Sequence, residues 1–431
     1  MKNFPRRSDA QTRRVAEAYR AIPGGSTNSL LQPDGQEFLI DRGEGAYVYD
    51  MDGRRYLDFM IGAGPMVLGH AHPRIVEAIR AQAGRGSQFF NMAERAVALA
   101  ERIIGLVPSA EMVRFASSGS EATFHALRLA RAATGRQMFI KFDGAWHGHH
   151  DLAVWSMEMS PTQIPEPYAI SQGIQAGVRE SLRVLPYNDI AAFRAMMAAH
   201  PGAFAAVIVE PMQRTLTPVP GFLEALREEC DRWGTVLIFD EVVSGFRVAP
   251  GGAQERWGVT PHLSCFGKAL GGGLPLAAIA GRRDLMEHLD PRSPFESYSF
   301  HCGTHNGHPI AVECAHTSLD LLVEEGGIAQ ICALGDYARD RLAAMFASRR
   351  VAAQITGAGP IFHFYFSDEP IHDHAAVRRS NVALCDAIHL KLLAGGIYKN
   401  FSKAYLSTAH TRDHVDELVE AIGWAFDQVT S

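Results

Sequence analysis

Hydrophobic positions recur with two different periods at the start of this chain, and the two periods predict different elements. Residues 9–21 carry apolar side chains at the spacing of an amphipathic helix, which the breakers Pro23-Gly24-Gly25 end. Residues 43–59 instead alternate apolar and polar positions around Asp52-Gly53, a pair that favours a hairpin turn. The chain is therefore expected to begin with a small lobe made of a helix and a hairpin.

A second pattern begins at about residue 110, where short apolar runs alternate with helical segments. Strands are predicted over 112–116, 138–142, 205–210 and 236–240. Helices are predicted over 121–134, from a cap at Asn188 to about 200, and over 221–233. This alternation is typical of an α/β domain with a mostly parallel sheet covered by helices. Ligands bind such sheets beyond the carboxyl ends of the strands, where we expect Glu210, Asp240 and the turn at Ser117.

The pattern changes again after about residue 312, towards an α+β arrangement. Helices are predicted over 311–325, 334–346, 378–393 and 413–429, and a strand over 360–366. We therefore expect an N-terminal segment of a small lobe (1–65), a large α/β domain (66–311) and a smaller C-terminal α+β domain (312–431). A length of 431 residues agrees with this division, because a single hydrophobic core rarely grows so large.

Composition and charge narrow the class of protein. Hydrophobic residues make up 47% and charged residues 20% of the chain, as in globular proteins, and the formal net charge of -6 argues against a nucleic-acid partner. The chain has no apolar stretch of the ~20 residues that a membrane span needs, and its first residues lack the apolar segment of a secretory signal. The six cysteines lie far apart without a CxxC pair, which favours reduced thiols over disulfides or a zinc site. We therefore expect a cytoplasmic protein without a metal.

Residues 235–275 concentrate the candidate chemistry. An apolar run ends on Asp240 and Glu241, and Lys268 follows between Gly267 and a run of three glycines. A lysine in such apolar surroundings loses its proton more readily than a surface lysine, as Schiff-base chemistry requires. A carboxylate at a strand end can hold a protonated pyridine nitrogen, and together these two groups are what a pyridoxal phosphate enzyme must supply. Asp240 alone would be explained equally well as a helix cap.

Three further segments have the residues to bind such a cofactor, although each also has an ordinary structural explanation. The turn at 117–121 lies between a strand and a helix, where small residues favour either a bound phosphate or a capped helix. Trp146 follows a strand and could stack on a flat ring, while its neighbouring histidines lack metal-ligand spacing. Thr304 lies in a polar loop before a helix, where it could contact a phosphate or only shape the turn.

These segments, in this order, resemble the class III (subgroup II) pyridoxal phosphate aminotransferases of fold type I. Within that family the chain is most similar to the branch of glutamate-1-semialdehyde 2,1-aminomutase and its transaminase relatives. The resemblance rests on residues 117–136, 141–151, 205–212, 239–282 and 303–304, with 64–73 and 405–411 extending it. It implies the fold type I architecture, with a mostly parallel sheet, and the cofactor pyridoxal 5'-phosphate.

The resemblance also implies a role for each matching residue. Lys268 matches the lysine that forms a Schiff base with the cofactor and then moves the substrate proton, and Asp240 matches the carboxylate on the pyridine nitrogen. Thr304 matches a phosphate ligand that relatives supply from the second subunit, which implies a homodimer. The complete implied cofactor-binding set is Ser118, Gly119, Ser120, Trp146, His147, Asp240, Val242, Lys268 and Thr304. Two members depart from the usual pattern, since Trp146 replaces a tyrosine or phenylalanine and Ser120 replaces a threonine.

Larger departures fall where the substrate is expected to bind. An arginine that holds the substrate carboxylate in the aminomutase corresponds to Gln32 here, and the gating loop has no match between 151 and 186. We therefore expect weak dependence on an ordinary α-carboxylate. The candidate substrate-pocket residues are Gln32, Ala63, Thr215 and Lys403, and the cations that could bind another anionic group are Lys403, Arg247 and Arg214.

The function implied is an aminotransferase that uses Lys268 to move an amino group between an amine or amino acid and a keto acid or aldehyde. The alternative is a glutamate-1-semialdehyde-type aminomutase or an ammonia-lyase, because both begin with the same proton abstraction. A non-catalytic protein that kept the fold is a third hypothesis, which the joint presence of Lys268, Asp240 and the Ser118 turn disfavours.

Overall fold

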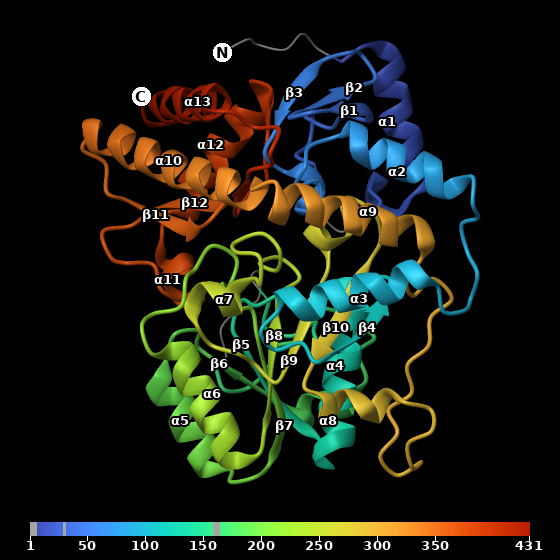
Figure 1. The fold of residues 1–431 in the computed structure, drawn as a ribbon. Coiled ribbons are helices and arrows are strands. Elements are labelled where there is room, and N and C mark those ends of the chain that lie inside the picture. The colour runs from blue at the N-terminus through green and yellow to red at the C-terminus, as the bar shows by residue number, and fades with distance from the viewer. Residues whose placement is uncertain (1–6, 29–31, 158–163) are drawn as a thin grey trace.

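The computed structural model describes residues 7–28, 32–157 and 164–431. A large helix-covered sheet occupies one half of the molecule, and the two ends of the chain lie together in the other half (Figure 1). The first helix, α1 (Asp9–Ala21), begins at the predicted place, where the Ser8 side chain accepts a hydrogen bond from the Gln11 N–H. None of the helices in the described ranges combines the length and the apolar composition needed to cross a bilayer.

The large sheet has seven strands in the order β4-β10-β9-β8-β7-β5-β6. Their bounds are β4 (Met112–Ala116), β10 (Ala277–Gly281), β9 (Leu263–Phe266), β8 (Val236–Asp240), β7 (Phe204–Val209), β5 (Met138–Phe142) and β6 (Leu182–Leu185). β10 runs antiparallel to both of its neighbours, whereas the four pairs from β9 to β6 are parallel. The predicted mostly parallel sheet is confirmed, and sequence analysis did not predict β6, β9 and β10.

Helices cover both faces of this sheet, which explains why its central strands are apolar throughout. On one face α4 (Gly119–Thr134) packs in a cluster that contains Ile208 and Ile238. On the other face α5 (Ile190–Ala199) and α6 (Phe222–Trp233) pack with Val207 and Phe239. Successive side chains of a strand point to opposite faces, so β7 and β8 bury every residue.

Five further helices in the described ranges belong to this half of the chain. They are α2 (Pro73–Ala83), α3 (Glu94–Leu106), α7 (Ala253–Trp257), α8 (Arg283–Met286) and α9 (Pro309–Leu319). A π-helical turn over Asp320–Glu324 continues α9, so the helix predicted over 311–325 is present but ends in a different geometry. The next helix, α10 (Gly327–Ser348), extends beyond both predicted ends.

Two predicted features were wrong. The N-cap of α5 is Asp189, whose side chain accepts the Ala192 N–H; the Asn188 side chain instead bonds to the carbonyls of Thr217 and His372. The helix predicted over 378–393 is divided into α11 (His374–Arg379) and α12 (Val382–Ala394). The division occurs because Ser380 is extended and the Asn381 side chain caps a new helix start.

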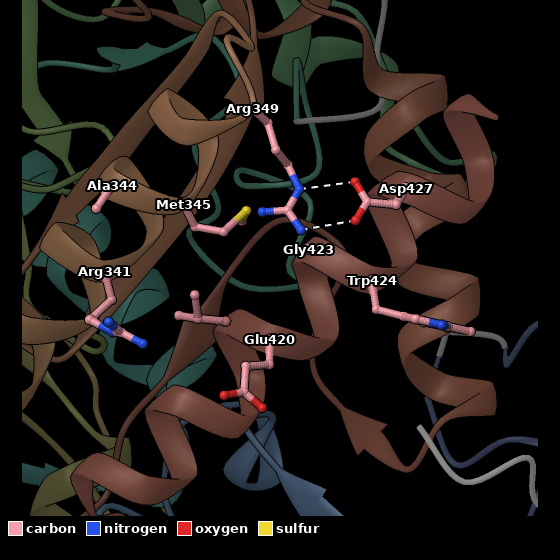
Figure 2. Close-up of a pocket in the computed structure, with 9 residues that line it drawn as sticks. Arg341, Ala344, Met345, Arg349, Glu420, Gly423, Trp424 and Asp427 are labelled. Atoms are coloured by element: carbon pink, nitrogen blue, oxygen red, sulfur yellow. Dashed lines mark hydrogen bonds and ion pairs between the residues drawn. The ribbon is translucent and has the colours of Figure 1, made fainter.

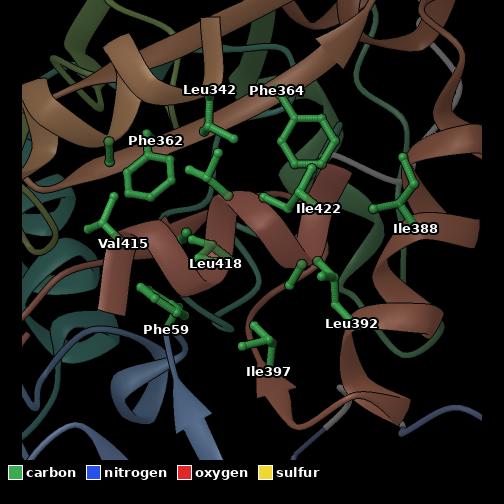
Figure 3. Packing of buried hydrophobic residues seen from close by; sticks show 14 of the residues in the cluster. Phe59, Leu342, Phe362, Phe364, Ile388, Leu392, Ile397, Val415, Leu418 and Ile422 are labelled. Atoms are coloured by element: carbon green, nitrogen blue, oxygen red, sulfur yellow. The ribbon is translucent and has the colours of Figure 1, made fainter. Parts of the chain in front are cut away.

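The two ends of the chain share a sheet and a core. The predicted hairpin is confirmed by β2 (Tyr47–Asp50) and β3 (Arg55–Asp58), which join β1 (Ile40–Glu44) and, in parallel, β13 (Ile397–Tyr398). A second small sheet contains β11 (Ala353–Ala358), β12 (Ile361–Phe366) and β14 (Ala404–Tyr405). In the shared cluster, Phe59 packs with Phe362 and with Leu418 of α13 (Arg412–Thr430), as Figure 3 shows. The boundaries near 65 and 311 stay a prediction.

Candidate active site

The carboxyl ends of neighbouring strands bring together residues that are far apart in the sequence. The segment after β5 carries Trp146 and His147, and the ends of β7 and β8 carry Glu210 and Asp240. The Trp146 N–H donates to Glu210 Oε1 at 2.7 Å. His147 Nδ1 lies 2.8 Å from Asp240 Oδ2. The predicted position of the site beyond the strand ends therefore describes a real convergence of polar groups.

Asp240 is held as a buried carboxylate with defined partners. Only 6% of Asp240 is exposed, and only 2% of His147. The Val242 N–H donates to Asp240 Oδ1 at 3.1 Å, so the backbone and the imidazole orient the two oxygens of the carboxylate. Such an oriented acid can hold a proton on a heterocyclic nitrogen placed against it.

The turn at Ser118 caps α4 and also packs against Val242. The Ser118 side chain accepts the Glu121 N–H, and Glu121 Oε2 accepts the Ser117 N–H at 2.7 Å. Gly119, the first residue of the helix, lies so close to Val242 that an added Cβ would be 2.8 Å from its Cγ1. The cap and the anion-binding turn are thus compatible, because a small residue and a helix N-terminus favour both.

Ser120 is tied to the segment that carries Trp146 and His147. Its hydroxyl accepts the His149 N–H at 2.9 Å, and a Cβ on Gly148 would meet that hydroxyl at 2.5 Å. The predicted phosphate turn, the predicted ring-stacking segment and Asp240 are therefore neighbours in the structure.

Lys268 follows directly from the strand next to that of Asp240. In the sheet, Asp240 pairs with Cys265 of β9, three residues before Lys268. Lys268 has a left-handed backbone with φ of 46°, a conformation that costs on the order of 1–2 kcal/mol for a residue with a Cβ. Its Cδ would lie 3.1 Å from a Cβ added to Gly64, so the lysine side chain runs along a glycine backbone.

The surroundings favour the neutral form of Lys268. Burial is the main cause that lowers the pKa of its amine, and the charge of Lys403 lowers the pKa further. Tyr405 and Asp240 act in the opposite direction without reversing the shift. A lysine with a lowered pKa can serve as nucleophile and as base near neutral pH.

The remaining cofactor candidates lie in more open positions. Trp146 is 45% exposed, with the Arg214 guanidinium 5.8 Å from its ring centroid. Thr304 lies on an exposed loop, where its carbonyl accepts a hydrogen bond from the Gln88 side chain. An exposed indole leaves one ring face available for stacking.

The substrate-pocket candidates occupy different surroundings. The Gln32 amide bonds to both backbone groups of Phe38, at 2.6 and 3.0 Å, and Ala63 is exposed with φ of 64°. Thr215 is fully buried and accepts a hydrogen bond from Thr356 at 2.9 Å. Lys403 is 7% exposed. Of the segment 151–186, residues 158–163 lie outside the described residues.

Two residues near Lys268 had no role in the sequence-based set, namely Gly64 and Tyr405. Both belong to segments that carried the family resemblance, 64–73 and 405–411, which was the available signal. These two segments are joined by hydrogen bonds such as the one from the Thr408 N–H to the Val67 carbonyl at 2.9 Å.

A hollow on the surface lies away from this site, between α10 and α13. Figure 2 shows Arg349 and Asp427 facing each other across it, with two hydrogen bonds of 2.9 Å, and Trp424 beside them. None of the predicted site residues lines it.

Comparison with known proteins agrees with this geometry. The family model described as "Aminotransferase class-III" matches residues 31–422. The chain belongs to the class III aminotransferase family. A glutamate-1-semialdehyde 2,1-aminomutase from Roseiflexus castenholzii is 40% identical over 426 residues, which cover 94% of each chain. The resemblance found in the sequence is thereby confirmed.

Solved structures of class III relatives share the whole architecture. An omega-transaminase from Sphaerobacter thermophilus superimposes with a TM-score of 0.93 at 33% identity, covering 98% of both chains. A structure described as a transaminase with PLP bound has a TM-score of 0.89 at 30% identity and the same coverage. The chain therefore has the α/β architecture of fold type I pyridoxal phosphate transferases, and it is an enzyme of the class III aminotransferase family.

Proposed function

We propose that this class III enzyme is a transaminase, which moves an amino group between an amine or amino acid donor and a keto acid or aldehyde acceptor. Its cofactor is pyridoxal 5'-phosphate, in agreement with the family and with the relative described as PLP-bound. The observation that carries the proposal is the placement of Asp240 and Lys268 at the ends of adjacent strands, β8 and β9.

The residues present fit this cofactor. Gly119 lets the turn approach Val242 closely, since a Cβ there would meet the valine at 2.8 Å. The buried carboxylate of Asp240 is oriented but has no lysine or arginine partner within 4 Å in the described part of the chain. When bound, pyridoxal phosphate supplies an aldehyde for the amino group and an electron-withdrawing ring.

Each residue then has a proposed task. Asp240 holds the proton on the pyridine nitrogen, and His147 orients its carboxylate through the 2.8 Å contact. Val242 and Trp146 enclose the ring, and the turn Ser118-Gly119-Ser120 at the start of α4 binds the phosphate. Lys268 would hold the cofactor and would accept the proton from the substrate carbon, a role that its lowered pKa favours.

A donor and acceptor screen tests the proposal. The purified holoenzyme is mixed with a panel of amines and amino acids, and conversion of the bound cofactor to its amino form is followed by absorption. A keto acid should then restore the starting spectrum. If no donor in a broad panel changes the spectrum, transamination is wrong.

Borohydride reduction tests the role of Lys268 separately. Reduction followed by peptide mapping should place the cofactor on the peptide that contains Lys268. Lys268→Ala should abolish this label, and Lys391→Ala, which removes an exposed lysine from α12, should retain it. A label on another lysine would contradict the assignment.

A second candidate function is an aminomutase, favoured by the 40% identity to the glutamate-1-semialdehyde 2,1-aminomutase from Roseiflexus castenholzii. This reaction needs no external acceptor. Product analysis with an amino-aldehyde substrate and no added keto acid separates the two functions. Repeated turnover under these conditions would favour the aminomutase, and a single turnover would favour the transaminase.

We also propose that the enzyme acts as a homodimer in which Thr304 completes the partner's phosphate site. Large apolar side chains are exposed around the Thr304 loop and the segment bonded to it through Gln88, as expected of an uncovered interface. They are Phe89, Phe90, Met92, Phe295 and Phe300, with exposed fractions from 51% to 89%. A cytoplasmic location stays the prediction made from the cysteines and the N-terminal residues.

Subunit mixing tests this proposal. A heterodimer of one Thr304→Ala subunit and one Lys268→Ala subunit contains one complete site only if Thr304 acts across the interface. Co-expression should therefore restore activity above that of either homodimer. No restoration in a dimer verified by light scattering would place Thr304 in its own subunit's site or outside the site.

A further inference from the structure

Three side chains from separate segments meet around Gly64, namely Lys268, Arg247 and Tyr405, and Lys403 joins them through Tyr405. A Cβ added to Gly64 would lie 3.1 Å from Lys268 Cδ and 3.5 Å from both Arg247 Nη2 and Tyr405 Cε1. The Arg247 Cζ and the Lys403 Nζ each lie 5.5 Å from the Tyr405 ring centroid. Lys403 also donates a hydrogen bond to the Tyr405 side chain.

Two cations of this cluster are buried without a matching anion. Arg247 is 0% exposed and Lys403 is 7% exposed. Throughout the described ranges, neither has an aspartate or glutamate oxygen within 4 Å. Uncompensated buried charges are costly, so proteins usually pair them.

Arg247 has an unused donor. Its Nε donates to the Val243 carbonyl at 2.8 Å and its Nη2 donates to the Gly64 carbonyl. Its Nη1 is buried and has no hydrogen-bond partner among the described residues. Burial lowers the pKa of Arg247 only to about 10, so the side chain stays charged at neutral pH.

The cations also act on Tyr405. Burial raises the pKa of its hydroxyl, but the charges of Lys403, Lys268 and Arg247 outweigh burial and lower it below the ordinary value. The cluster therefore has a positive potential with a hydroxyl, an ammonium and a guanidinium in it. These are the donors that recognise a carboxylate.

We propose that Arg247, Lys403 and Tyr405 bind a carboxylate of the substrate next to the amine that reacts at Lys268, an inference that rests on the proposed transaminase function. The cofactor phosphate does not satisfy these cations, because its proposed site is the Ser118 turn at the start of α4. The preferred substrates are then amino acids and keto acids, and simple amines and aldehydes are poorer.

This cluster would replace the carboxylate-binding arginine of the aminomutase, which corresponds to Gln32 in this chain. Gln32 is occupied by the backbone of Phe38, and the Arg214 guanidinium lies near the Trp146 ring and the Gly144 carbonyl. The cationic cluster supplies the positive charge instead, from Lys403 just before β14 and from Arg247 in the segment after β8. Gly64 lies between Lys268, Arg247 and Tyr405, where a side chain on residue 64 would approach all three.

Paired substrates test the inference. Alanine and ethylamine differ only by a carboxylate, as do 3-aminobutanoate and isopropylamine. In Lys403→Met, the ratio of kcat/KM for the acid to that for the matching amine should fall about tenfold to a hundredfold, the range for one lost charge-assisted hydrogen bond. Lys403→Arg should restore most of the ratio. Lys391→Met, which removes one exposed lysine from α12, should leave it unchanged.

A binding measurement on the holoenzyme gives a second readout. Butanoate has a carboxylate but no amine, and its Kd from calorimetry should increase by a similar factor in Lys403→Met and by less in Tyr405→Phe. If Lys403→Met does not fold, the butanoate Kd is compared in Tyr405→Phe and Lys403→Arg, and Tyr405→Phe should bind butanoate more weakly than the wild type. An unchanged Kd and an unchanged ratio in folded variants would overturn the inference. Loss of all turnover with Lys403-dependent butanoate binding retained would instead refute only the transaminase function.

Discussion

Substitution of Gly119 by alanine tests the contact on which the cofactor turn depends. A Cβ at this position would lie 2.8 Å from Val242 Cγ1 and 2.9 Å from Cγ2, against a favourable carbon separation of about 3.5–4.0 Å. Rotation of the valine does not relieve the contact, since both of its methyl groups face the glycine. Either Val242 or the turn must therefore move.

The expected magnitude follows from two opposing effects. Overpacking of this kind costs about 1–3 kcal/mol. Alanine in place of glycine in a helix contributes about 0.5–1 kcal/mol of stability, and less at the first residue of α4. Gly119→Ala should thus lower the free energy of unfolding by about 1–2 kcal/mol. Cofactor affinity should fall about tenfold, because the displaced groups are the proposed phosphate turn and the proposed ring contact.

A double-mutant cycle with Val242→Ala isolates the contact. Without the valine methyl groups, Gly119→Ala should be neutral or slightly stabilising, which gives a coupling energy of about 1–3 kcal/mol. Urea unfolding is followed by fluorescence and circular dichroism at a fixed cofactor concentration, since coincident curves are needed for a two-state interpretation. Gly105→Ala in α3 is the matched control, because a Cβ there meets no atom within 4 Å.

Additive effects of Gly119→Ala and Val242→Ala on the free energy of unfolding would refute the proposed contact. If Gly119→Ala has the same cost with valine and with alanine at 242, the close approach is not its cause. A loss of cofactor affinity without any coupling would instead place the effect on the phosphate turn alone.

Three further predictions concern the site and its surroundings. Asp240→Asn should reduce kcat at least about a hundredfold, because the amide carries no negative charge; a near-normal kcat in a folded variant would contradict this role. Gly64→Ala and Gly53→Ala both place alanine at positive φ and should each lose about 1–2 kcal/mol of stability. Only Gly64→Ala should also impair borohydride trapping at Lys268, because the new Cβ would lie 3.1 Å from Lys268 Cδ. Burial lowers the pKa of Lys399 from 10.5 to about 8. Below pH 8 the folded protein therefore bears the cost of a buried charge, and this cost disappears as the pH rises towards 10.5. The unfolding free energy of the wild type relative to Lys399→Met should therefore rise by about 3 kcal/mol between pH 7 and 10.5, and a pH-independent difference would exclude this linkage.

Local sequence patterns were sufficient for the elements whose signals lie within a few residues. The strand at 236–240 was predicted because it is apolar throughout, and the helix after Ser118 because a cap, small residues and a glycine stop define both of its ends. Local signals failed where a distant residue decided the outcome. Asn188 has the composition of a cap, but its amide bonds to the carbonyls of Thr217 and His372, and Asp189 caps the helix instead.

The candidate site divides in the same way. Lys268 and Asp240 were predicted as candidates from their immediate neighbours, because a strand end and flanking glycines can be recognised in the sequence. The pairing of Asp240 with Cys265, and the contact of His147 with Asp240 across 93 residues of sequence, needed the order of strands in the sheet. No local pattern specifies that order, since it follows from how the helices bury both faces of the sheet.

By itself the sequence determined the family and its cofactor chemistry, and it predicted Lys268 and Asp240 as the residues at the centre of that chemistry. Only the tertiary structure decided which cations lie beside Lys268. Arg247, Lys403 and Tyr405 come from two regions more than a hundred residues apart, and a chain end folded back against Gly64 brings them together. Burial is what makes these charges favour an anionic ligand, because the same cations exposed to water would be solvated and would need no partner.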